Sequence, residues 1–332
     1  MNTKLLAATI AATACGTNAF AAEIYNSEGS TISLGGYVDV GIGEYSSDEV
    51  EVHQVSPRLN VSGTQDVGNG ITVDAKGEWA LKYLDGGDTS FTTRLGYIGM
   101  THDQAGRLAL GTQWAPYYDV AGVADMPIAF ANDFIYSNHG NLGSGRGDKM
   151  VTYRKGFAFG DDMSLDFGLG WQGKHTEAAT VYDARGQIAV SFSMMGIGLG
   201  YVYNGGEVDN VDAESHAVSL KVGNYSNGLY SAVVYANNDN FYESLYESEQ
   251  YEVLLAYGLG NGLNLSVNYE AVTGKATANS SDLTQFSQSA LQAEYNFTPK
   301  LVGFAGYQID LGDDDPATED DDKWTIGARY FL

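Results

Sequence analysis

The sequence predicts an all-β protein: a 16-stranded antiparallel transmembrane β-barrel with one long loop folded into the lumen. Three observations predict it. Polar and apolar residues alternate along its strands, short turns recur at intervals near 34 residues, and no apolar run beyond the N-terminus reaches the length of about 18 residues that a spanning helix needs.

The alternation is clearest in residues 260–273. Gly260, Asn261 and Gly262 are turn residues that tolerate positive φ. The strand that follows alternates an apolar set with a polar set: Leu263, Leu265, Val267, Tyr269 and Ala271 against Asn264, Ser266, Asn268 and Glu270. A period of two places the sets on opposite faces. No apolar partner sheet is in evidence, so we expect the apolar face to meet lipid and the polar face to line a lumen.

The spacing of the tight turns predicts the number of strands. They lie at Gly68–Gly70, Asp103–Gly106, Gly160–Asp162, Met195–Gly196, Ser226–Gly228, Asn261–Gly262 and Thr298–Pro299. A period near 34 residues accommodates two strands of about 10–13 residues, one tight turn and one longer loop. Seven turns join strands in pairs, and a free strand at each end brings the total to sixteen.

The charges of residues 71–83 fix the inner face. Thr72, Asp74, Lys76, Glu78 and Lys82 share one face, opposite Ile71, Val73, Ala75, Trp79, Leu81 and Tyr83. Charged side chains are costly in lipid, so the charged face is predicted to be the lumen. Aromatic residues near strand ends, such as Tyr83, Tyr257 and Trp324, suit the girdles of an outer-membrane barrel.

The 332-residue chain has a formal charge of −25 and no linker-like tract, which favours one architecture from end to end. So acidic a chain is not expected to bind nucleic acid, whose phosphates require Lys and Arg. The charge indicates solvated loops and a preference for passing cations.

The N-terminus is predicted to be a secretory signal peptide. Lys4, an apolar stretch over residues 5–12 and the Ala19–Ala21 site fit this pattern, with cleavage after Ala21. The predicted domains are therefore 1–21, the signal peptide, and 22–332, the barrel. A lipoprotein site at Cys15 is the alternative. Cleavage after Ala21 removes this only cysteine, so no thiol chemistry is expected.

Polar, acidic stretches between the tight turns are predicted to be the outer loops. They are Ser46–Gln54, Asp85–Ser90, Lys174–Asp183, Gly205–Glu214, Asn237–Glu249, Gly274–Gln285 and Leu311–Asp322. The last is the most acidic but does not match an EF-hand, so a solvated loop is expected; weak contact with divalent ions is the alternative.

One interval between tight turns is much longer than the period near 34 residues. The stretch from Trp114 to Gly147 is less acidic and richer in apolar residues than the other loops. A long loop with its own apolar content tends to pack against another part of the protein instead of remaining fully solvated. The lumen of a sixteen-stranded barrel is the buried place available, so residues 114–147 are predicted to fold inward and narrow the channel.

The chain resembles the trimeric general-diffusion porins of Gram-negative outer membranes. The stretches that carry the resemblance are Ala22–Asn26, Arg58-Leu59 followed by Gly63, Thr93–Tyr97 with Gly99, Tyr118–Val120, Val151–Arg154 and Ala328–Leu332. The resemblance covers the mature chain and implies a homotrimer in the outer membrane, with neither a cofactor nor a metal.

In that family the inward loop forms an eyelet, with acidic groups on the loop facing a ladder of arginines. Carried over by position, the basic side is Arg58, Arg94 and Arg146, and the acidic side is Asp125 and Asp133. Strand phase separately places two of them in the lumen. Arg58 shares a face with Asn60, and Arg94 lies opposite Leu95.

Two positions depart from the family pattern. Ala129 stands where the eyelet glutamate is usual, which implies a wider constriction or a weaker transverse field. Leu332 replaces the usual terminal phenylalanine in the segment that the barrel-assembly machinery reads.

Catalytic signals are weak. Gly168-x-Gly170-x-x-Gly173 lies in a predicted strand, Leu165–Trp171, without a following helix, so it does not indicate a dinucleotide site. The five histidines fall in predicted loops and turns without metal-ligand spacing, and no Gly-x-Ser-x-Gly elbow exists.

The predicted function is passive diffusion of ions and small hydrophilic solutes through a weakly cation-selective, water-filled channel, without enzyme activity. Outer-membrane lipid, lipopolysaccharide and the barrel-assembly machinery are the expected partners besides a trimer. The alternatives are a structural or adhesive barrel that acts through its external loops, and a barrel enzyme.

Overall fold

The computed structural model describes residues 21–46, 48–84, 91–135, 139–177, 179–242, 245–314 and 321–332. The predicted signal peptide lies outside this range except for Ala21. The predicted loop Asp85–Ser90 lies outside it entirely, and residues 315–320 of the loop Leu311–Asp322 do so as well.

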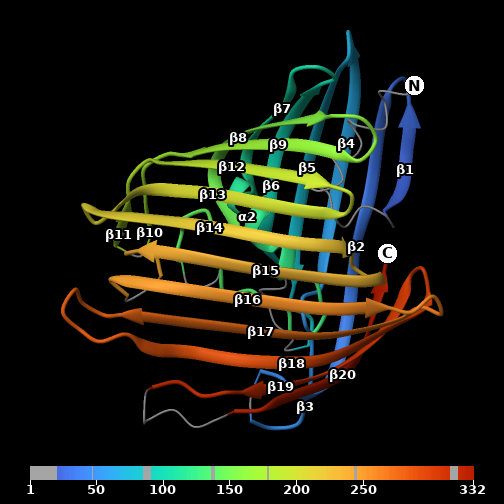
Figure 1. Ribbon diagram of the computed structural model, residues 1–332. Coiled ribbons are helices and arrows are strands. Elements are labelled where there is room, and N and C mark those ends of the chain that lie inside the picture. Colours follow the sequence, from blue (N-terminus) through green and yellow to red (C-terminus); the bar gives the residue numbers. More distant parts are fainter. Residues whose placement is uncertain are drawn as a thin grey trace.

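Sixteen long strands form one closed antiparallel sheet, as predicted (Figure 1). They are β2 (Ser30–Glu44), β4 (Arg58–Gly68), β5 (Ile71–Leu81), β6 (Phe91–His102), β7 (Gly106–Trp114), β8 (Arg146–Ala158), β9 (Met163–Gln172), β12 (Arg185–Met194), β13 (Ile197–Val208), β14 (Val211–Asn224), β15 (Asn227–Asp239), β16 (Glu247–Gly258), β17 (Leu263–Lys275), β18 (Leu283–Thr298), β19 (Leu301–Asp310) and β20 (Lys323–Phe331). The ring closes where β20 pairs with β2, with Phe331 opposite Tyr37. Two short strands, β1 (Ala22–Ser27) and β3 (Glu51–His53), also pair with β2.

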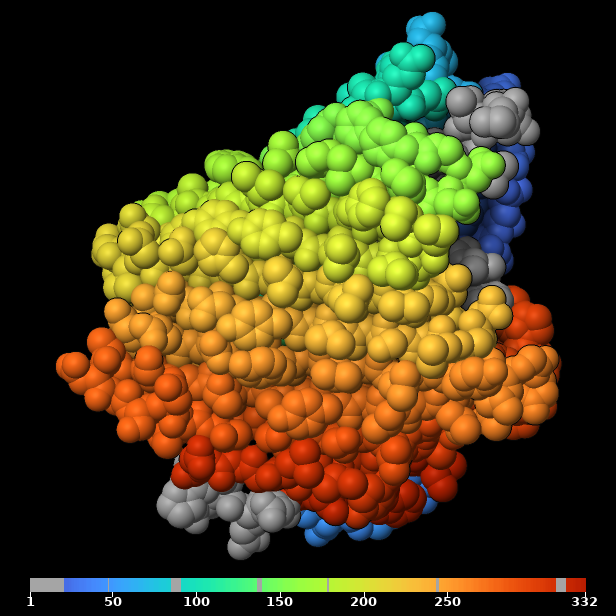
Figure 2. All heavy atoms as spheres, viewed as in Figure 1, coloured from blue at the N-terminus to red at the C-terminus, as the bar shows by residue number. Residues whose placement is uncertain are grey.

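The barrel is apolar outside and polar inside. In β17 the predicted outer residues Leu265, Val267 and Tyr269 are exposed, whereas Asn264, Ser266, Asn268 and Glu270 are buried. Figure 2 shows the strands of one side packed into a continuous wall. Among the described residues, none of the helices has the length and apolar character that crossing a bilayer requires.

All seven predicted tight turns join consecutive long strands, at the end of the barrel where the C-terminus lies (Figure 1). One predicted outer loop, 205–214, is wrong, and two others contain short strands, since 46–54 contains β3. Residues 174–183 contain a small hairpin of β10 (His175–Glu177) and β11 (Thr180–Tyr182). Residues 205–214 continue β13 and β14 to a two-residue turn at Asp209 and Asn210, whose φ values of 50° and 66° are typical of a hairpin turn. Four of the five histidines that were predicted in loops or turns therefore belong to strands: His53 ends β3, His102 ends β6, His175 begins β10 and His216 lies within β14.

The described residues of the long loop, 114–135 and 139–147, fold into the lumen. The loop begins with a short helix, α2 (Pro116–Ala121), and a 3₁₀ turn, η2 (Gly122–Ala124). Tyr117 and Val120 of α2 are buried in one cluster with Ala189, Val202 and Ala217, inward residues of β12, β13 and β14.

Glycines on the wall make room for this helix. A side chain at Gly168 or Gly170 of β9 would lie 3.1 Å from Pro116, and one at Gly200 of β13 would lie 2.9 Å from Val120. The glycine pattern of β9 is therefore a packing surface for α2, which agrees with the rejection of a dinucleotide site.

Candidate functional site

One carboxylate lies at the centre of the basic wall. Glu78 of β5 is 2% exposed, and its oxygens lie 3.1 Å from Arg94 Nε, 3.3 Å from Lys76 Nζ and 3.8 Å from Arg58 Nη1. Three cations from β4, β5 and β6 thus share one buried anion. The wall keeps an excess of positive charge because one carboxylate offsets only part of it.

Arg94 reaches this cluster through a β-bulge. Glu78 pairs with Leu95 and Trp79 pairs with Thr93, which leaves Arg94 as the extra residue. Register partners project to the same face, so Leu95 lies on the lumenal side with Glu78, where it is 2% exposed. The sequence argument that Arg94 points inward because Leu95 points outward is therefore wrong. The bulge directs both side chains inward.

A second group of contacts, made by Tyr37, Arg329 and Asp39, supports Arg58 on the basic wall. The Tyr37 ring lies between two guanidinium groups, with its centroid 4.9 Å from Arg58 Cζ and 4.0 Å from Arg329 Cζ. Arg329 also donates to Asp39 Oδ2 from Nε at 3.0 Å and from Nη2 at 2.8 Å. Since Arg329 is in β20 and Asp39 in β2, this ion pair spans the closing seam.

The start and the end of the loop meet at Trp114 and Arg146. Arg146, the first residue of β8, has its guanidinium carbon 5.8 Å from the centroid of the Trp114 ring. The helix α2 is tied to the same strand by Asp119, which accepts from Arg154 Nε at 2.6 Å. Arg154 also donates to the Trp114 carbonyl at 2.9 Å.

The predicted acidic residues lie on the loop. Asp125 follows η2, and its Oδ2 accepts a hydrogen bond of 2.6 Å from the Tyr118 hydroxyl. Burial and the neighbouring Asp125 raise the pKa of Tyr118 well above its usual range, while Arg58 opposes the shift. Asp133 lies further along, with an exposed side chain that lines the lumen.

The loop is seated on three wall carboxylates. Glu294 of β18 accepts from the backbone N–H of Ile128 at 2.7 Å, and Glu252 of β16 accepts from that of Ile135 at 3.2 Å. Glu270 of β17 accepts from the N–H groups of Asp133 and Phe134 at 3.1 and 3.3 Å. These wall side chains replace the water that would otherwise bond the loop backbone.

His139 fastens the outer part of the loop. Its Nε2 lies 3.1 Å from Gln250 Oε1, and its Nδ1 lies 3.1 Å from Ser144 Oγ. Burial lowers the pKa of His139 to about 3, so the ring is neutral at physiological pH. A neutral ring that donates from Nε2 and accepts at Nδ1 satisfies both contacts.

Ala129, at the position of the missing eyelet glutamate, faces the wall. It is 7% exposed and packs with Phe130, Ala290 and Phe304, and its carbonyl accepts from the Tyr45 hydroxyl at 2.9 Å. The loop here contributes a packing contact instead of a charge.

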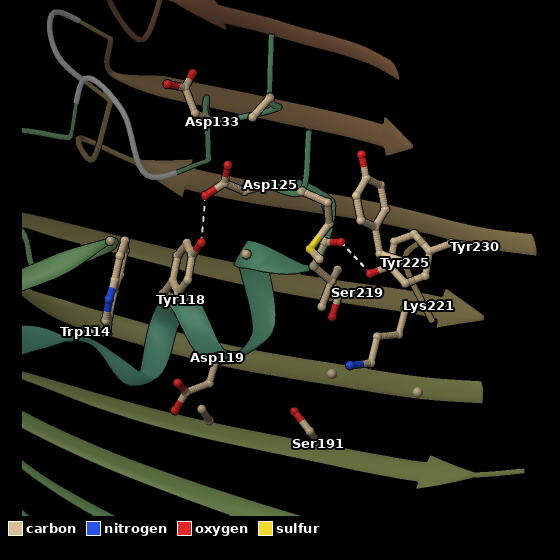
Figure 3. Close-up of a pocket in the computed structure, with 18 of the residues that line it drawn as sticks. Trp114, Tyr118, Asp119, Asp125, Asp133, Ser191, Ser219, Lys221, Tyr225 and Tyr230 are labelled. Atoms are coloured by element: carbon tan, nitrogen blue, oxygen red, sulfur yellow. Dashed lines mark hydrogen bonds between the residues drawn. The ribbon is translucent and has the colours of Figure 1, made fainter. Parts of the chain in front are cut away.

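All five predicted site residues line one cavity. Its volume is about 2120 Å³, and its lining runs from the β8–β9 turn at Gly160–Asp162 to Lys323 at the opposite, loop end of β20. Figure 3 shows Tyr118, Asp125 and Asp133 projecting into it from the loop. In the described part of the chain, no group of three or more His, Cys, Asp or Glu side chains could hold a metal ion. The arrangement is a water-accessible passage with basic groups on one wall and acidic groups on the loop.

Several groups that hold the site together were not among the predicted site residues. Glu78 and Lys76 were placed on the lumenal face but not at the site, and the same phase rule that found Arg58 would have added them. Glu252, Glu270 and Glu294 alternate like any lumenal residue, and their role depends on loop contacts that no local pattern records.

Comparisons with known proteins agree on one family. A family model described as Gram-negative porin matches residues 7–332. The chain is 26% identical over 366 residues to outer membrane porin F of Salmonella typhimurium and 27% identical over 366 residues to outer membrane porin C of Enterobacter cloacae, with 99% of each chain covered.

Solved structures show the same fold. The chain matches the structure titled "Salmonella typhi OmpF complex with Daunomycin" with a TM-score of 0.80 and 20% identity, over 94% of this chain and 100% of that one. An anion-selective porin from Comamonas acidovorans matches with a TM-score of 0.68 and 15% identity, over 91% and 100%. The shared fold alone therefore does not determine ion preference.

Proposed function

The chain belongs to the Gram-negative porin family, and we propose that Arg58, Arg94 and Arg146, opposed by Asp125 and Asp133, form the constriction of its channel. The protein is a general-diffusion porin of the outer membrane. The observation that carries the proposal is the continuous cavity, which passes all five residues and reaches both ends of the barrel.

Opposed fixed charges explain how such a passage sorts solutes. They orient water across the pore, so a polar solute exchanges one set of hydrogen bonds for another, while an apolar solute must disrupt ordered water. The charged groups are held by neighbours such as Glu78 and Tyr118, so the field persists without a bound ligand.

We propose weak cation selectivity that originates mainly outside the constriction. Basic residues slightly outnumber acidic ones among the described residues of the cavity lining, so the lining itself does not favour cations. The formal charge of −25 resides largely in the acidic outer stretches, including Asp313, Asp314, Asp321 and Asp322. These carboxylates raise the local concentration of cations at the entrance.

Reversal potentials at two salt concentrations test this origin. The screening length falls from about 10 Å at 0.1 M to about 3 Å at 1 M salt, so a preference set by the outer loops should be clear at 0.1 M and largely lost at 1 M. Changing Asp313, Asp314, Asp321 and Asp322 to Asn together should weaken it at 0.1 M. Anion preference at 0.1 M would contradict the proposal.

We also propose that the protein assembles as a homotrimer. A similar structure, of OmpT of Vibrio cholerae, is described as a trimer form and matches with a TM-score of 0.68. Planar-bilayer insertions should then raise conductance in groups of three equal steps; single steps would argue for a monomer. Contacts with lipopolysaccharide and with the barrel-assembly machinery, and inward constriction by residues 114–147 as a unit, remain predictions.

A structural or adhesive role through the outer loops is the alternative function. It predicts a barrel without ion conductance. Liposome swelling with sugars of graded size distinguishes the two, because an open pore gives swelling rates that fall with solute size and a plugged barrel gives none.

A further inference from the structure

Two aromatic rings connect a basic and an acidic residue of the proposed constriction. The rings of Trp114 and Tyr118 stack with centroids 4.1 Å apart and an interplanar angle of 24°. The guanidinium of Arg146 lies over Trp114. The Tyr118 hydroxyl donates to Asp125 (Figure 3).

The packing around the pair favours positioning over ligand binding. Trp114 already contacts Tyr118 and Arg146. Tyr118 also lies against Gly122, where an added Cβ would stand 2.6 Å from its Cε2 and Cζ atoms. Both rings are half-buried at the cavity wall, and the stacked face of each is covered by the other ring, so the two hold one another in place.

The acidic residue needs such support because of its place in the chain. Asp125 directly follows η2, at the start of a stretch without regular secondary structure. The hydrogen bond from the Tyr118 hydroxyl restricts the rotamers open to the Asp125 carboxylate. The raised pKa of Tyr118 keeps its hydroxyl protonated, and so a donor, throughout the physiological range.

We infer that Trp114 and Tyr118 are positioning residues that fix the Asp125 carboxylate relative to Arg146 and so set the transverse field of the channel. This inference rests on the proposed role of Asp125 in the constriction. The two rings act through the charged groups and contribute no charge themselves.

The experiment compares cation-to-anion permeability ratios at 0.1 M salt for Asp125→Asn, Tyr118→Phe and the double variant. Tyr118→Phe keeps the ring and removes the donor. We expect it to lower the ratio by about twofold, which is the effect of moving a carboxylate by roughly 2 Å from a passing cation in water. In the Asp125→Asn background it should have no further effect.

Other variants separate positioning from general disruption. Trp114→Phe should keep the ratio near that of the wild type, whereas Trp114→Leu should lower it. Gly122→Ala should lower it as well, because the φ of −73° accepts alanine and the three atoms nearest to the added Cβ all belong to the Tyr118 ring. Tyr235→Phe is the matched control: it removes a hydroxyl that donates to Glu249, 2.8 Å away on the outer face. Heat-modifiable gel migration verifies folding.

The failures of the two ideas are distinguishable. If Asp125→Asn lowers the ratio and Tyr118→Phe does not, the positioning role is wrong and the constriction stands. An equal effect of Tyr118→Phe with and without Asp125 also overturns it. If Asp125→Asn itself has no effect, the proposed constriction role of Asp125 fails, and the inference fails with it.

Discussion

Buried carboxylates do different work in two regions of this barrel. On the basic wall, Glu78 lies within 3.8 Å of three cationic side chains and has charge as its partner. On the opposite wall, Glu252, Glu270 and Glu294 accept backbone N–H groups of the inward loop. The residue type and its place on the lumenal face are the same, so the partner decides whether a glutamate tunes a field or holds a loop.

The largest expected effect comes from removing one of the glutamates that hold the loop against the wall. Glu270→Leu leaves the N–H groups of Asp133 and Phe134 without their acceptor, which costs about 3–4 kcal/mol for the two donors together. Amide exchange in residues 128–135, followed by mass spectrometry, should accelerate by about 10²–10³-fold. Glu270→Gln, which keeps one acceptor oxygen, should give a smaller change. Unchanged exchange in Glu270→Leu would show that the seat does not depend on this residue.

A second prediction concerns how pH affects the stability of the loop on the same wall, where His139 contacts Gln250 of β16. The pKa of His139 is lowered to about 3 in the folded protein, so the unfolded loop binds a proton that the seated loop does not. The free energy that neutral His139 contributes to seating the loop is fully present above the unfolded pKa of 6.5. It is lost as pH falls from there toward 3, and the loss is about 2 kcal/mol by pH 5.

Hydrogen exchange in residues 139–145, corrected for the intrinsic pH dependence, measures this loss. The protection should decrease on acidification in the wild type. In His139→Gln the dependence should flatten, even though the protection at pH 7 also changes. A wild-type loop whose protection is independent of pH between 7 and 5 would disprove the argument.

A smaller effect than those on the loop seat is expected on the basic wall. Glu78→Gln removes the anion shared by Arg58, Lys76 and Arg94 and should shift the permeability ratio toward anions. One charge at about 6 Å in water changes a barrier by about 0.7 kcal/mol, roughly threefold. Reversal potentials test it, with Glu249→Gln on the outer face as the control. If both variants shift the ratio equally, Glu78 has no special place in the field.

The barrel itself was predictable because its signals are local. Turn pairs such as Asn261-Gly262 recur at a regular spacing, and alternation placed Arg58 and Glu270 on the inner face. The errors arose where a local rule has an exception. Asp209 and Asn210 looked like part of a long loop but form a tight hairpin turn, and the bulge at Arg94 reversed the phase of its strand.

The contacts that complete the site were beyond such rules. The acceptor of the Phe134 N–H is Glu270, which lies 136 residues away in the sequence. Neither residue indicates the other in the sequence. A backbone N–H is present in every residue except proline, so the residue type does not reveal which acceptor it binds. Loop packing on Gly168 and Gly200 likewise becomes visible only when the strands are assembled.

The seat of the loop also bears on the order of assembly. Residues 128–135 rest on β16, β17 and β18, which are synthesised more than 100 residues after the loop. Contacts so distant along the chain form late, because the entropy of closing long loops must be overcome first. The barrel should therefore form first with an open lumen. The narrow part should appear only when the strands of the last third of the chain pair into the sheet.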